Sequence, residues 1–217
     1  MAERPRSAYP RDSVEFNRVL AFSDGVFAIA MTLLVVGIVV PKLTDGSDVG
    51  ELADALNDLT SNLVSFFISF AVIGRYWLAH HEFFGLLSRI DQGAISLNLV
   101  YLAFIAFLPF PTALLGTYFE NPLSVVIYAA AVGIISGMEV VAFRHAYRAG
   151  LLERAISPQV YRWGVLNSLS PVGFFILSMP IAFVSTTLAV VSWFLVMPWA
   201  LFIQRWKPEG ADELTLH

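Results

Sequence analysis

The sequence contains no cysteine, which excludes disulfides, thiolate metal sites and cysteine nucleophiles. Charged residues are scarce, at 14% of 217 residues, whereas hydrophobic residues make up 57%. The segment from Met1 to Asn17 is polar and has no signal-peptide pattern, so we expect the first apolar segment to direct insertion. A soluble domain of this length does not tolerate so apolar a composition. We therefore expect an integral membrane protein.

Long apolar stretches supply six segments of about 20 residues, the length that a helix needs to cross a bilayer. They cover residues 18–41, 59–79, 93–115, 122–143, 163–184 and 187–204. Asn121 and Pro122 are a start signal for the fourth helix, and Ser157 and Pro158 precede the fifth. Almost no sequence remains for a soluble region, so we expect an all-α membrane protein with one six-helix domain over residues 1–217.

The distribution of basic residues predicts the orientation. Of the 13 lysine and arginine residues, every one except Lys42 falls on the side of the membrane that holds the amino terminus. The positive-inside rule places that side in the cytoplasm. We expect a multi-pass protein of the plasma membrane with both termini cytoplasmic and the lipid bilayer as a partner. Nothing in the sequence indicates a nucleic-acid partner.

The first outer loop carries the opposite charge. Its acidic residues are Asp45, Asp48, Glu51, Asp54 and Asp58. One interpretation is an acidic mouth that concentrates cations outside the membrane. The other is an ordinary solvated loop, since sparse surface charge of this kind is common.

No internal repeat is evident, because the aspartate-bearing pattern of the first span does not recur in the fourth. This weakens the hypothesis of a transporter built from inverted repeats. Chains of this size that form pores commonly complete them by symmetry, with one helix from each copy at a shared axis. We therefore expect an oligomer.

The first span begins with ionisable and polar residues, namely Arg18, Ser23 and Asp24. Such groups are costly inside a membrane and indicate a partner or a water path. Candidate donors at the same predicted depth are Trp77 and His80 in the second span and Asn98 in the third. We expect a buried network that joins three helices, with His80 as a hydrogen-bond partner of Asp24.

Beyond Asp24 the helix carries one stripe of small, branched and hydroxyl side chains. The stripe consists of Gly25, Ala28, Ile29, Thr32, Leu33 and Val36. Branched apolar residues at this spacing are able to form successive rings around an axis and to gate a pore by dewetting. Spacing alone favours the other interpretation, a helix-packing seam.

The first span also carries a recognisable signature, Arg18 followed after three residues by Phe22, Ser23 and Asp24, and then by the apolar run to Leu34. Together with Trp77 and the paired histidines His80 and His81 that end the second span, it resembles the prokaryotic branch of the transmembrane protein 175 family, relatives of the lysosomal potassium channel. The length and the six-span count match over nearly the whole chain.

The resemblance implies a homotetrameric, potassium-selective cation channel whose first helix lines the pore, without the Thr-Val-Gly-Tyr-Gly carbonyl filter and without a cofactor beyond the permeant ion. Ile29 then forms the narrowest ring, Leu33 and Val36 stack outward, and Thr32 adds a hydroxyl layer. The signature residues and their partners hold the subunits together; these are Arg18, Phe22, Ser23, Asp24, Trp77, His80 and Asn98. Val36 is shorter than the leucine often found at the outer ring.

Two other function classes use residues from the same region. A proton-coupled secondary transporter would use Asp24, His80 and Glu139, the last of these an acid in the fourth span. A membrane-embedded enzyme would combine Ser23, Asp24 and His80, which supply the residue types of a catalytic triad. Ser23 and Asp24 are adjacent and diverge by about 100° on a helix, and no oxyanion motif accompanies them. We expect no enzyme.

The remaining polar side chains favour structural roles. His80, His81 and Glu82 are the only compact set of metal-ligand types. Adjacent residues diverge by about 100° on a helix, and no further ligand is placed to complete a site, so we expect no metal centre. We expect Glu139 to pair with Arg144 or His145, just over one turn along the same helix. Gly133 and Gly137 form a Gly-x-x-x-Gly pair, which is typical of tight helix packing.

Overall fold

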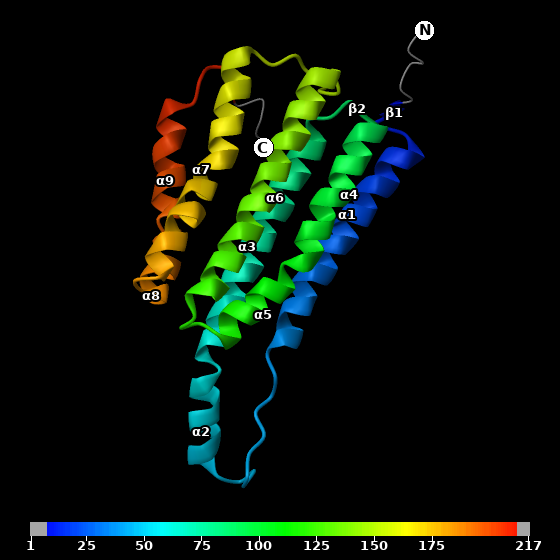
Figure 1. Ribbon diagram of the computed structural model, residues 1–217. Coiled ribbons are helices and arrows are strands. Elements are labelled where there is room, and N and C mark those ends of the chain that lie inside the picture. The colour runs from blue at the N-terminus through cyan, green and yellow to red at the C-terminus, as the bar shows by residue number, and fades with distance from the viewer. Residues whose placement is uncertain (1–7, 212–217) are drawn as a thin grey trace.

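The computed structural model describes residues 8–211, and the outermost parts of both predicted cytoplasmic termini lie outside this range. Long helices dominate the fold, and a pair of short strands closes one end (Figure 1). In chain order the elements are β1 (Ala8–Pro10), α1 (Val14–Leu33), the 3₁₀ helix η1 (Leu34–Gly37), α2 (Val49–Asp58), α3 (Thr60–Gly85), β2 (Arg89–Asp91), α4 (Gln92–Phe107), α5 (Pro109–Thr117), α6 (Pro122–Ala149), α7 (Pro158–Ala182), α8 (Thr186–Trp193), α9 (Val196–Ile203) and the 3₁₀ helix η2 (Gln204–Trp206).

Six helical segments are long and apolar enough to span a membrane, as the sequence predicts. They run over Val14–Gly37, Thr60–Gly85, Gln92–Thr117, Pro122–Ala149, Pro158–Ala182 and Thr186–Trp206. The third consists of α4 and α5, which meet at Leu108, and the sixth consists of α8, α9 and η2. The prediction of a multi-pass, all-α membrane protein is confirmed.

Capping side chains explain where the helices begin. Asn121 and Ser157 accept backbone N–H groups at the starts of α6 and α7, and the proline that follows each occupies the first helical turn. The predicted boundaries of the first span are shifted. α1 begins at Val14, because the Ser13 hydroxyl accepts the Phe16 N–H at 3.2 Å. The helical segment formed by α1 and η1 ends at Gly37, four residues before the predicted end of the span at residue 41.

The loop after the first span is partly helical, which the sequence analysis missed. Asp48 caps α2 by accepting the N–H groups of Gly50 and Glu51. Glu51 accepts the N–H groups of Thr44 and Asp45, and these two bonds lower the pKa of its carboxyl. The hydroxyl and N–H of Ser47 likewise lower the pKa of Asp45. Asp45, Asp48 and Glu51 therefore hold the loop in shape through these bonds, and α2 extends beyond the bundle (Figure 1).

The two strands are the second feature that the sequence analysis missed. β1 and β2 pair antiparallel, with Ala8 opposite Asp91 and Pro10 opposite Arg89. Their three-residue length gives no periodicity to read, and the pairing joins residues far apart in sequence. The strands lie at the end of the bundle opposite α2 (Figure 1).

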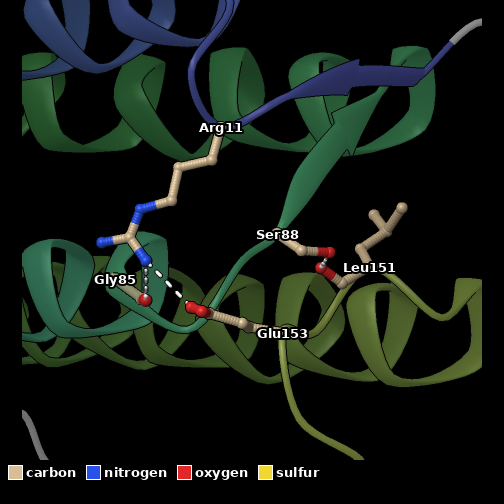
Figure 2. Close-up of polar contacts among 5 residues, drawn as sticks. All are labelled: Arg11, Gly85, Ser88, Leu151 and Glu153. Atoms are coloured by element: carbon tan, nitrogen blue, oxygen red, sulfur yellow. Dashed lines mark hydrogen bonds and ion pairs between the residues drawn. The ribbon is translucent and has the colours of Figure 1, made fainter.

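The same end is tied together by contacts across three segments (Figure 2). The Arg11 guanidinium donates to the Gly85 carbonyl and to the Glu153 carboxylate, both at 3.0 Å. The Ser88 N–H donates to the Leu151 carbonyl at 2.9 Å. These bonds fix the amino-terminal strand, the α3–β2 turn and the α6–α7 connection against one another.

Helix α6 occupies the centre of the main core. Its side chains Val125, Tyr128 and Ile135 are fully buried, and it packs against α4, α5 and α7. Buried hydroxyls pair with one another there: Ser69 donates to Tyr128 at 3.0 Å and accepts from Thr112 at 2.8 Å. Satisfying these groups internally is what permits polar residues at this depth.

The glycine pair on α6 marks no close helix approach within the subunit. A Cβ at Gly137 would meet no atom within 4 Å, and one at Gly133 would meet only Val172 at an ordinary 3.8 Å. The close helix crossing lies instead at Gly116, where a Cβ would stand 2.9 Å from Asn62. Only glycine permits α5 to approach α3 this closely.

Candidate functional site

Helix α1 has two unlike faces. One face packs into the subunit through Phe16, Ser23, Phe27 and Ala30, all of them buried. The other carries the predicted stripe, which no part of the described chain covers. There Ile29 is 60% exposed, Leu33 45% and Val36 70%, and Gly25, Ala28 and Thr32 are exposed as well. Because α1 lies at the edge of the bundle (Figure 1), this face is available to lipid or to another subunit.

The hydroxyl of Thr32 has a fixed orientation. It donates to the Ile29 carbonyl of the preceding turn at 2.9 Å. Because the hydroxyl proton is donated to this backbone carbonyl, Thr32 presents the lone pairs of its oxygen on the exposed face. A ring of such oxygens around an axis would be able to accept hydrogen bonds from water or to coordinate a cation.

Asp24 sits on the exposed face, and its partner is Trp77. The indole N–H of Trp77 donates to Asp24 Oδ1 at 2.9 Å, which joins α3 to α1. The predicted hydrogen bond between Asp24 and His80 does not form. The reason is that Asp24 lies on the outer side of α1, whereas His80 is buried on the inner side of α3.

His80 belongs to a second chain of hydrogen bonds. Its Nε2 pairs with Asn98 Oδ1 at 2.9 Å, Asn98 Nδ2 donates to the Ser23 hydroxyl at 2.9 Å, and Ser23 donates to the Val19 carbonyl at 2.9 Å. Asn98 is suited to the central place because its amide both donates and accepts. Three helices, α1, α3 and α4, are joined as the sequence predicts, but through two separate links.

Aromatic rings enclose the histidine. The ring of Phe84 stacks on that of His80 with centroids 4.3 Å apart, and those of Phe27 and Tyr101 lie within 6 Å. Outside this cluster His81 stacks on Trp77 at 5.8 Å. The two adjacent histidines therefore face different surroundings. Among residues 8–211, no group of three or more histidine or acidic side chains is arranged to hold a metal ion.

Two signature residues contact little in their own subunit. Phe22 is 55% exposed, and Arg18 is exposed on the same helix. Within the described residues Arg18 forms no ion pair, since the two pairs present are Arg11 with Glu153 and His145 with Asp91. Both side chains are free to contact another copy of the chain.

The predicted pairing of Glu139 is wrong. Glu139 accepts from the Tyr101 hydroxyl at 3.4 Å and forms no ion pair with Arg144 or His145. His145 instead contacts Asp91 at 2.8 Å, at the start of α4. Asp91 also caps α4 by accepting the Ala94 N–H at 2.7 Å. Its place directly before an apolar helix is a capping signal that can be read from the sequence.

The residues of the two alternative functions are not brought together. Asp24 bonds to Trp77, His80 to Asn98 and Glu139 to Tyr101, so a transporter would lack a shared proton site among them. The geometry of a triad is also missing, because Ser23 and His80 contact Asn98 rather than each other. The arrangement is that of a frame that fixes α1 against α3 and α4.

Comparison with known proteins identifies the family. A family profile described as endosomal/lysosomal potassium channel TMEM175 matches residues 18–109, which contain all of the signature residues. A protein of Streptomyces collinus named potassium channel is 36% identical over 184 residues, which cover 82% of this chain and 87% of that protein. The chain belongs to the TMEM175 family.

The fold of the TMEM175 family extends over nearly the whole chain. The crystal structure of a lysosomal potassium-selective channel TMEM175 homolog from Chamaesiphon minutus aligns with a TM-score of 0.73 at 29% identity, covering 90% of this chain and 99% of that one. The human relative is named endosomal/lysosomal proton channel TMEM175 and is 35% identical over 122 residues, which are 50% of this chain and 24% of that protein. The similarity to the bacterial relatives is therefore the more complete.

Proposed function

We propose that this protein is a potassium-selective cation channel of the TMEM175 family, in which four copies form a pore lined by α1. Potassium flows passively and is the permeant ion, with no further cofactor. Each copy contributes one six-helix domain over residues 1–217. The named function of the bacterial relatives and the match over nearly the full length of both chains support this proposal.

The observation that carries the pore on α1 is the composition of its uncovered face. A face turned to lipid would be uniformly apolar, whereas this one begins with Arg18 and Asp24 and includes Thr32. Ionisable side chains toward lipid are costly and normally face the interior of a bundle or a water-filled cavity. Assembly of several copies around an axis would give this face both a partner and a water path.

The two hydrogen-bond links give the proposed pore its rigidity. They attach the inner half of α1 to α3 through Trp77 and to α4 through Asn98. The stripe residues beyond Asp24 are thereby held at a fixed rotation about the helix axis. We infer that Ile29 forms the narrowest ring, with Leu33 and Val36 stacked outward and Thr32 beside the constriction.

Selectivity in such a pore has a physical limit. Apolar side chains do not replace a hydration shell as backbone carbonyls do. Partial dehydration at Ile29 therefore needs compensation from retained water and from the outward lone pairs of Thr32. We expect potassium to be preferred because it sheds water more readily than sodium, and we expect the preference to be modest.

The proposed location is the plasma membrane, with the strand end in the cytoplasm. That end carries Arg89, Arg148, Arg154 and Arg162, whereas Lys42 lies on the α2 side. The positive-inside rule then orients α2 and its acids outward.

The test is the reversal potential of the purified full-length protein in planar bilayers, with potassium on one side opposed by sodium on the other. A reversal potential shifted well toward the potassium equilibrium value supports the proposal. A second recording, with equal potassium and a pH gradient, follows from the name of the human relative. A reversal potential that follows the proton gradient, or flux without current, would overturn the proposal.

A further inference from the structure

A pocket of about 340 Å³ opens between α4 and α6, and no residue of α1 lines it. It is lined by Leu97, Val141, Arg144, His145, Arg148 and Ala149. Its volume falls within the range of about 300 to 1,000 Å³ that is typical of small-molecule sites. Neither the hydrogen-bond frame of α1 nor the proposed pore uses these residues.

Within the part of the chain that the structure describes, the two arginines of the pocket have no hydrogen-bond or ion-pair partner. Arg144 and Arg148 lie four residues apart, on one face of α6 about 6 Å apart along the axis. Both are exposed, and among residues 8–211 neither guanidinium forms an ion pair or a hydrogen bond. Two adjacent guanidinium groups are well suited to bind a phosphate, because each offers several donors in a planar fork.

The nearby carboxylate does not neutralise them. The carboxylate of Asp91 is engaged by other groups, because its Oδ1 contacts His145 Nε2 at 2.8 Å and accepts the Ala94 N–H at 2.7 Å. His145, which binds this carboxylate, forms a wall of the pocket. The net charge presented to a ligand is positive.

The depth of the pocket indicates a lipid. The 28 residues of α6 measure about 42 Å, longer than the hydrocarbon core of about 30 Å, so the last turn of α6 reaches the headgroups. Arg144 and Arg148 lie at that end, whereas Val141 lies one turn deeper and Leu97 lies inside α4. The positive groups are therefore at headgroup depth, and the apolar wall is at acyl-chain depth.

We propose that this pocket binds an anionic phospholipid. Arg144 and Arg148 bind its phosphate, and the part of the acyl chain nearest the headgroup packs against Val141 and Leu97. Basic pockets between transmembrane helices at such a depth are known to hold anionic headgroups. A soluble phosphate would find the same arginines but would gain nothing from the apolar wall.

The test is native mass spectrometry of the full-length protein, exposed to equal amounts of phosphatidylglycerol and phosphatidylcholine with identical acyl chains. We expect the wild-type protein to retain phosphatidylglycerol preferentially. The Arg144→Gln/Arg148→Gln variant should retain at least fivefold less phosphatidylglycerol than the wild-type protein. The matched control is Arg154→Gln/Arg162→Gln, which removes two exposed charges from the same end but outside the pocket. This control should retain the lipid as the wild-type protein does.

A second variant tests the apolar half of the site. Val141→Trp fills the acyl-chain wall at an exposed position and should reduce retention severalfold while both arginines remain. Equal retention by the wild-type and double-glutamine proteins would overturn the proposal, as would equal loss in the control. Displacement of the lipid by millimolar glycerol 3-phosphate would also overturn it, because the site would then recognise phosphate alone.

Discussion

Trp77 donates its indole N–H to Asp24 across the α1–α3 contact, and it does so from a side chain that is 37% exposed. Trp77→Phe removes this donor and should lower the free energy of unfolding by about 1 kcal/mol, the scale of hydrogen bonds between membrane helices. The measurement is thermal unfolding in detergent.

Trp199→Phe is the matched control, since Trp199 is 38% exposed and its indole N–H has no hydrogen bond within the described residues. An equal effect of the two substitutions would show that the Asp24 bond contributes nothing. Asp24→Asn keeps an oxygen acceptor and should cost less than Trp77→Phe.

Asn98 connects Ser23 and His80, so its removal leaves the side chains of Ser23 on α1 and His80 on α3 without this hydrogen-bond partner. Asn98→Ala should lower the free energy of unfolding by about 2 kcal/mol, from two buried hydrogen bonds at about 1 kcal/mol each. Asn167→Ala on α7 is the control, because its partly exposed side chain makes no hydrogen bond among residues 8–211. Equal melting temperatures for the two variants would contradict the bridging role of Asn98.

Gly93 lies under the imidazole ring of His145. A Cβ at this position would stand 2.7 Å from Cε1 and 2.8 Å from Nε2 of that ring. Gly93→Ala should therefore destabilise the protein by about 1 to 3 kcal/mol, although alanine normally favours a helix. His145→Ala should restore part of the loss by vacating the space.

Gly137→Ala provides the control for this clash, because an added Cβ there meets nothing within 4 Å. It should leave stability unchanged or slightly increased. A Gly93→Ala variant as stable as Gly137→Ala would mean that the His145 ring moves aside at no cost.

Ile29→Ser replaces the proposed narrowest ring by a small polar side chain. We expect conductance to rise severalfold and the preference for potassium over sodium to fall, because water and ions then pass without dewetting. Single-channel recording in mixed potassium and sodium measures both. Ile176→Ser on α7 is the control at a similarly exposed isoleucine, 53% against 60%; unchanged currents for Ile29→Ser would remove Ile29 from the constriction.

Substitutions of acidic residues in α2 test whether the first outer loop concentrates cations at the pore entrance. Asp54 and Asp58 are exposed and, unlike Asp48 and Glu51, cap nothing. Asp54→Asn/Asp58→Asn should lower inward conductance in about 10 mM salt, where the Debye length is about 30 Å, and should have no effect in about 1 M salt. A reduction that persists at high salt would point to a structural defect instead.

The six spans and the helix starts at Pro122 and Pro158 were predictable because they depend on local signals. Apolar length, prolines and capping side chains act within a few residues of the helix that they define. The exposed stripe on α1 was predictable for the same reason, since helical periodicity alone decides which residues share a face. The signature residues around Asp24 were found because charge is conspicuous in an apolar span.

The tertiary structure decided which of these residues meet. His80 and Trp77 lie three residues apart on α3. The rotation of that helix about its axis decides that Trp77 bonds to Asp24 and His80 to Asn98. The same is true of His145, which contacts Asp91 rather than Glu139 on its own helix. Sequence determined the membrane spans and their polar positions, because these are local properties. Helix packing determined the hydrogen-bond partner of each polar side chain, because a hydrogen bond requires a specific distance and direction between helices that sequence spacing does not encode.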